Sequence, residues 1–182
     1  ADTRPTWNPF EDVKTESWFY DSVKYVYEQG MMVGTDSTHF SPNLNTSRAM
    51  IATILWRLSG SPETKAALTY PDCVHGSWYA QAVAWGTGDG VVKGYGNGEF
   101  GPDDTITREQ LAVMLWRYAG SPAAGGTLNA FADSDKAGGW AVDGLCWAVS
   151  RGILTGRGGG ILDPVGQATR AEAAAMLSRF IG

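Results

Sequence analysis

One motif recurs three times along the chain, and this internal repeat constrains the fold more than any other feature. Phe10, Tyr70 and Phe131 open equivalent segments, at spacings of 60 and 61 residues. Later markers keep spacings of 60 and 62 residues, and they are two glycines, a proline and an arginine: Gly30, Gly90, Gly152; Gly34, Gly94, Gly156; Pro42, Pro102, Pro164; Arg48, Arg108, Arg170. About 60 residues with two short helices cannot bury their own apolar faces, so we expect the three copies to fold together.

The sequence pattern of each copy predicts two short helices. The second has apolar residues at i, i+3, i+4 and i+7, as in Ile51, Ile54, Leu55 and Leu58. Its N-cap is Ser47, Thr107 or Thr169, and Gln110 and Glu172 complete capping boxes in copies two and three. The first helix is expected to run from Trp18, Trp78 or Trp140 to about Gln29, Gly88 or Ser150. Small residues on one face make these first helices candidates for a shared central bundle.

Composition places the chain among globular proteins and narrows its partners. Of 182 residues, 43% are hydrophobic and 18% charged, and 24 glycines favour short elements. The net charge of −5 argues against general adhesion to nucleic acid or anionic membranes, so an anionic partner must be bound locally. The sequence contains no run of about 18 apolar residues, so it predicts no membrane span. Residues 1–9 lack the apolar core of a secretion signal, so we expect a processed product or an excised segment.

The cysteines and histidines give no sign of metal or redox chemistry. Cys73 and Cys146 are expected to be two packed thiols rather than a disulfide. His39 and His75 are not equivalent in the repeats and have no partner histidine at a ligand spacing, so we expect them on the surface. No metal and no cofactor are predicted.

The combined markers resemble the S-layer homology (SLH) domain. Its repeats pair an F-x-D…W opening with a G-x-x-x-G turn and a T-R-A-E helix start, which is intact here only at Thr169 to Glu172. The resemblance implies a mainly α fold of three two-helix repeats, 1–62, 63–122 and 123–182, closed into one pseudo-threefold unit around a shared helical core. It also implies binding of a secondary cell-wall polysaccharide of Gram-positive bacteria, commonly ending in pyruvylated N-acetylmannosamine.

The repeated arginines are the first candidate ligand-binding residues. Arg48, Arg108 and Arg170 stand at the first position of a helix, where a cation faces the positive end of the macrodipole. Together with the helix-start amides they would form an anion site suited to a carboxylate. The alternative is a structural salt bridge, such as Arg48 with Asp12. Since copy three replaces the loop Phe by Leu162, we expect Arg48 and Arg108 to matter more than Arg170.

Three further sets complete the candidate site. The aspartates either cap the turn into the first helix or accept hydrogen bonds from sugar hydroxyls. The first tryptophans are expected to pack against a neighbouring repeat, with stacking on a sugar as the alternative. The first glycines serve positive φ at helix ends, and backbone approach to a ligand is secondary. These residues are Asp12, Asp72, Asp133; Trp18, Trp78, Trp140; and Gly30, Gly90, Gly152. Trp56 and Trp116 lie off the apolar stripe, so they either fill a groove between repeats or are exposed.

The predicted function is a non-catalytic anchoring module at the bacterial cell wall. Its partner would be an acidic, pyruvylated wall glycan that tethers an exported protein to the surface, and the module would be a monomer. A catalytic centre would break the threefold pattern, whereas the polar markers here occur three times. Two alternatives stay open: a glycan hydrolase fragment using acids such as Glu99 and Asp103, and a protein–protein assembly module.

Overall fold

The structure is a computed structural model that describes residues 3–182. These residues form six α-helices and two short 3-10 helices, with no β-strand among them. The elements are α1 (Tyr20–Glu28), α2 (Arg48–Leu58), α3 (Ala80–Gly88), α4 (Arg108–Tyr118), η1 (Ser134–Lys136), η2 (Gly139–Ala141), α5 (Val142–Ser150) and α6 (Arg170–Ile181). Each repeat therefore has two α-helices, as predicted. None of the described helices has the length and apolar character needed to cross a bilayer.

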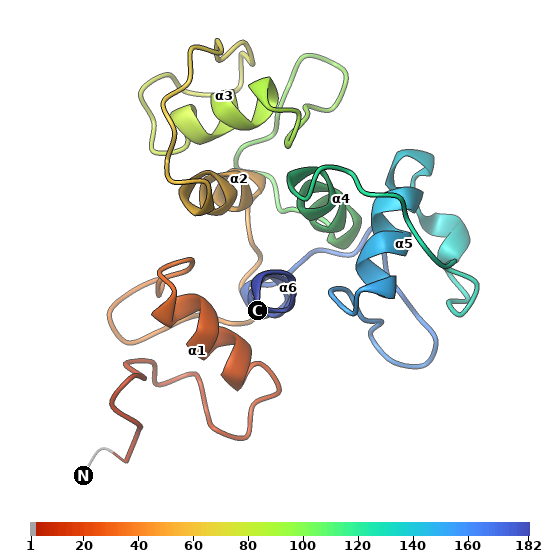
Figure 1. The fold of residues 1–182 in the computed structure, drawn as a ribbon. Coiled ribbons are helices and arrows are strands. Elements are labelled where there is room, and N and C mark those ends of the chain that lie inside the picture. The colour runs from red at the N-terminus through yellow and green to blue at the C-terminus, as the bar shows by residue number, and fades with distance from the viewer. Residues whose placement is uncertain (1–2) are drawn as a thin grey trace. The chain divides into compact units, whose positions relative to one another are not determined.

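The chain forms two compact units whose boundaries do not follow the repeats. One comprises the residues up to Asn45 together with Thr169–Gly182, and the other is Thr46–Ala168. In the first unit α1 packs on α6; in the second α2 packs on α3, and α4 on α5 (Figure 1). Each first helix therefore packs mainly on the second helix of another repeat. The expected bundle of first helices is wrong, because the small residues serve these other pairs: a Cβ on Gly144 of α5 would lie 2.9 Å from Val113 of α4.

The second helices begin where their N-caps predict. Ser47, Thr107 and Thr169 each accept a hydrogen bond from the amide three residues on, and the last two form complete capping boxes. The predicted apolar stripe is buried through its first three positions. Part of the opposite face is buried as well, since the small side chains of Ala52 and Thr53 are covered while Arg57 is exposed. The segments that join the repeats, 63–69 and 123–130, contain no helix.

A ring of three backbone hydrogen bonds joins equivalent residues within the second unit. The amide of Thr46 donates to Ala168, that of Ala168 donates to Ile106, and that of Ile106 donates to Thr46, at 2.8–3.0 Å. All three residues are buried and each precedes the N-cap of a second helix. The ring therefore fixes where α2 and α4 begin relative to each other.

The loop between the two helices of a repeat folds back against the start of that repeat. A Cβ on Gly34 would lie 2.5 Å from the carbonyl oxygen of Asp36 and 2.6 Å from the ring of Phe10. Gly94 and Gly156 are equally crowded by a loop carbonyl and by the aromatic ring that opens their own repeat. The second glycine of the G-x-x-x-G turn is thus required by close packing, since any side chain would displace the loop.

Candidate functional site

The repeated arginines lie beneath the loop of a different repeat. Arg48 Nε donates to the carbonyl of Phe100 at 2.9 Å, and its Nη2 donates to the carbonyl of Lys93 at 2.8 Å. Arg108 makes the same two bonds to Leu162 and Thr155, and Arg170 makes them to Phe40 and Val33. The three residues are only 4%, 4% and 7% exposed. Each arginine therefore holds a loop in place through two carbonyls.

The expected ranking of the arginines assumed that each arginine acts with the loop of its own repeat, and the structure pairs each one with the loop of another repeat. The loop that ends in Leu162 belongs with Arg108, while Arg48 and Arg170 lie under loops that end in a phenylalanine. The guanidinium carbon of Arg48 lies 4.7 Å from the ring centroids of both Tyr95 and Phe100. Burial lowers the pKa of Arg48, and nearby acidic and phenolic groups oppose that change. An arginine remains charged throughout, so the aromatic faces and carbonyls stabilise a buried cation.

The helix-start amides are already bonded, which corrects one half of the expected anion site. The amides of Arg48 and Ala49 donate to the carbonyls of Asp104 and Pro102 at 3.0 Å. The third amide, of Met50, donates to the Ser47 hydroxyl. The same pattern occurs at the starts of α4 and α6. An anion bound here would therefore meet side-chain donors and not free helix-start amides.

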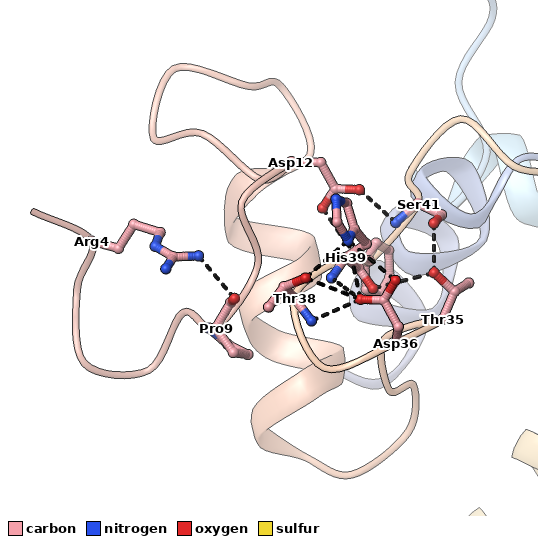
Figure 2. Close-up of polar contacts among 9 residues, drawn as sticks. Arg4, Pro9, Asp12, Thr35, Asp36, Thr38, His39 and Ser41 are labelled. Carbon is pink, nitrogen blue, oxygen red and sulfur yellow. Dashed lines mark hydrogen bonds and ion pairs between the residues drawn. The ribbon is translucent and has the colours of Figure 1, made fainter. Parts of the chain in front are cut away.

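The repeated aspartates do not cap the turn into the first helix, so that expectation is wrong. Both carboxylate oxygens of Asp12 accept loop amides at 2.9 Å, one from Phe40 and one from Ser41. Figure 2 shows the bond to Ser41. Asp72 and Asp133 bind the two equivalent amides of their own repeats. The second of these amides always belongs to a residue with positive φ: Ser41, Gly101 or Asp163. The aspartate thus holds the sharp turn at the end of the loop.

These hydrogen bonds lower the pKa of two of the aspartates. At Asp133 the bond from the Leu162 amide is the largest influence. At Asp72 burial acts in the opposite direction, but the amides of Phe100 and Gly101 and the charge of Arg48 together lower the pKa below its ordinary value. Both carboxylates are therefore ionised at neutral pH, in the form that accepts the loop amides.

The first tryptophans are more exposed than a packing role requires. Trp18, Trp78 and Trp140 are 63%, 55% and 53% exposed, and each stands two residues before the helix that it was expected to begin. Trp140 lies in η2, which packs on α4. The Glu109 carboxylate also accepts the amide of Gly138, two residues before Trp140, at 3.0 Å. The indole of Trp140 is thus held against a neighbouring repeat with much of its surface open.

Several other sequence features have structural roles. Gly30, Gly90 and Gly152 have φ of 71°, 74° and 69° just after a first helix, as expected for helix ends. Trp56 and Trp116 are half-buried, and each indole donates to the carbonyl of the proline six residues on, Pro62 or Pro122. Cys73 and Cys146 are buried free thiols, as predicted.

Both histidines lie on the surface, as predicted. His39 contacts the Asp36 carboxylate at 3.1 Å, and this contact raises the pKa of His39 (Figure 2). Residues 3–182 contain no group of histidine, cysteine and acidic side chains placed to hold a metal ion.

A groove of about 420 Å³ lies within the second unit, beside Arg48. Its volume is in the range of small-ligand sites. It is lined by residues of all three repeats: Arg48, Lys93, Gly94, Tyr95, Gly96, Gln110, Val113, Met114, Arg117 and Trp140. Three of these residues carry positive charge and none is acidic. An indole, a phenol and a side-chain amide complete a surface that can bind a polar, negatively charged ligand.

Sequence reasoning singled out Arg48 and Trp140 but missed most of this groove. Arg117 was available as a signal, because Arg57, Arg117 and Arg179 recur in register near the end of the second helices. Tyr95 gave no such signal, since Thr35 and Arg157 replace it in the other repeats. Its hydroxyl donates to Asp104 at 2.7 Å, and burial with this bond raises its pKa to about 12. Tyr95 therefore stays a neutral hydroxyl in the groove.

Comparison with known proteins gives the same repeats. The family model described as the S-layer homology domain matches residues 9–50, 70–112 and 130–174. Relatives include an endoglucanase of Bacillus sp. (strain KSM-635), 30% identical over 95% of this chain and 19% of the relative. An S-layer protein of Bacillus thuringiensis subsp. finitimus is 31% identical over 93% and 21%. An amylopullulanase of Thermoanaerobacterium thermosulfurigenes is 29% identical over 92% and 9%. This chain therefore spans about a fifth or less of these relatives, and it belongs to the S-layer homology domain family.

Proposed function

We propose that the three repeats form a non-catalytic anchoring module that binds an acidic glycan of the bacterial cell wall. The observation that carries the proposal is the groove beside Arg48. In a chain of net charge −5, it gathers three cationic side chains and no acidic one. Charge of this kind, concentrated at one place, favours an anionic ligand over general adhesion.

The chemistry of the lining narrows the ligand to an acidic sugar. Guanidinium groups bind carboxylates through paired hydrogen bonds. The open indole of Trp140 offers an apolar face for a sugar ring, and the side-chain NH2 of Gln110, whose oxygen accepts the Thr107 amide, offers donors for hydroxyls. A wall polysaccharide ending in pyruvylated N-acetylmannosamine combines a carboxylate, hydroxyls and an apolar ring face. We therefore propose this terminus as the ligand.

Membership of the family and the nature of the relatives support a surface role. An S-layer protein, an endoglucanase and an amylopullulanase each carry a stretch similar to this chain, and in each it is a small part of the whole. A segment shared between proteins with such different names is better explained by attachment than by a common reaction. We infer that this chain holds a larger exported protein at the cell wall.

The test is calorimetric titration of the 182-residue protein with purified wall polymer and with the same polymer after chemical removal of its pyruvate. We expect binding to the first and loss of binding to the second. Equal binding to both would contradict recognition of the carboxylate. Release of reducing sugar during incubation would support the hydrolase alternative instead, and sedimentation with walls stripped of polymer would support protein–protein assembly.

A further inference from the structure

Arg117 is the one guanidinium in the groove that the fold does not use. It lies in the last turn of α4 and is half-buried, and no residue in the range 3–182 forms a hydrogen bond or ion pair with its side chain. Burial and the charge of Arg48 both lower the pKa of Arg117. The equivalent Arg57 and Arg179 are exposed to solvent. Of these three equivalent arginines, only Arg117 is therefore partly desolvated beside another cation.

The two arginines of the groove differ in how their charge is satisfied. Arg48 uses Nε and Nη2 on two carbonyls, and its face lies against Tyr95 and Phe100. Arg117 retains all five N–H donors, and the residues that line the groove with it include no carboxylate. Two like charges in a partly dry site repel each other unless an anion lies between them. Asp104 and Asp72 act on Arg48 from outside the lining. Arg117, by contrast, has no carboxylate partner among residues 3–182, so the donors free to hold an anion in the groove come from Arg117.

We propose that Arg117 is the principal anion-binding residue of this groove, and that Arg48 is a positioning residue that holds the loop under which it lies. This inference rests on the proposed function, because the anion is taken to be the carboxylate of the wall glycan. The carboxylate accepts N–H bonds from the Arg117 guanidinium and offsets the repulsion between Arg117 and Arg48. Arg48 adds a second positive charge near the bound carboxylate, while its own hydrogen bonds keep the loop from Lys93 to Phe100 in place.

The first experiment titrates a synthetic methyl glycoside of pyruvylated N-acetylmannosamine into the wild type and into Arg117→Gln, Arg117→Lys and Arg48→Gln, with thermal melting of each variant in the absence of ligand. Arg117→Gln should lose roughly 10- to 100-fold in affinity. Its melting temperature should equal or exceed that of the wild type, because the repulsion from Arg48 is gone. Arg117→Lys should bind with intermediate affinity, since it keeps the charge but not the paired donors. Arg48→Gln should lower the melting temperature, which a ligand contact alone would not do.

Arg151→Gln is the matched control, because it removes one exposed positive charge at the end of α5, outside the residues that line the groove. It should bind and melt like the wild type. If Arg117→Gln binds the glycoside as tightly as the wild type does, the inference is wrong while the proposed function stands.

A second probe separates the two ideas. Sodium pyruvate replacing sodium chloride at constant ionic strength should raise the melting temperature of the wild type and of Arg151→Gln but not that of Arg117→Gln. If this holds while the wild type fails to bind the glycoside and the polymer, the proposed function is overturned and Arg117 is still an anion site. Equal responses of all three proteins to pyruvate would overturn the anion site itself.

Discussion

At the scale of single residues, the most demanding positions are those where a small group fills a space that nothing larger can enter. Gly94 is such a position, because the loop carbonyl of Glu99 and the ring of Tyr70 would lie 2.6 and 2.8 Å from a Cβ there. The loop has no free direction in which to move, since Asp72 and Arg48 hold it at Phe100.

We expect Gly94→Ala to lower the free energy of unfolding by about 1–3 kcal/mol, the usual cost of forcing extra volume into a packed site. Urea denaturation measures this quantity. Gly139→Ala is the control, because its Cβ would meet nothing within 4 Å. A Gly94→Ala protein as stable as Gly139→Ala would show that the loop is not closely packed.

Thr46 is the opposite case, because it is a polar residue at a buried position where the other two repeats have an apolar residue. Its hydroxyl oxygen is buried and has no hydrogen-bond partner within residues 3–182, while the equivalent positions are Ile106 and Ala168. Thr46→Val keeps the shape and removes the unsatisfied hydroxyl, so we expect a gain of about 1 kcal/mol in the free energy of unfolding. Thr46→Ser, which keeps the hydroxyl and loses the methyl, should be less stable than the wild type. A loss of stability in Thr46→Val would mean that the hydroxyl is satisfied.

At the scale of elements, the sequence predicted what is local and missed what depends on partner choice. The caps at Ser47, Thr107 and Thr169 could be read directly, because a capping residue acts within four positions of itself. The loop above Arg48 could not, since three loops at nearly equal spacing satisfy the same pattern. The groove was missed for the same reason: Gln110 and Arg117 become neighbours of Arg48 only after α2 has taken the loop of the second repeat.

The hydrogen bonds that loop amides donate to Asp72 and Asp133 make the stability of these loops depend on pH. The pKa values of Asp72 and Asp133 are lowered from 3.8 in the folded protein, so their contribution to stability is full above about pH 4. It is lost as the pH falls through the folded pKa values, because protonation removes the charge that binds the amides. We expect the melting temperature to fall below pH 4, and Asp72→Asn to be less stable at pH 7 with a smaller dependence on pH. Asp103→Asn, at an exposed neighbouring carboxyl, should follow the wild-type pH profile. An Asp72→Asn profile parallel to that of the wild type would contradict this role of the Asp72 carboxylate.

At the scale of the whole molecule, the three repeats are predicted to close into one cooperative pseudo-threefold unit. Each compact unit contains residues of more than one repeat, and the second carries the ring of Thr46, Ile106 and Ala168. Deleting residues 130–182 removes α6, which packs on α1, and α5, which packs on α4. It also removes Arg170, which holds the loop at Phe40. The remaining two repeats should therefore melt broadly, with low enthalpy, because neither terminal helix pair is complete.

The control is a circular permutant opened in the 63–69 linker, with Gly182 joined to the N-terminus by about 15 glycine and serine residues. It retains every helix pair and should melt in one sharp transition near that of the wild type. A sharp, native-like transition in the truncated protein would show that two repeats suffice, and closure of three would then not be what stabilises the fold.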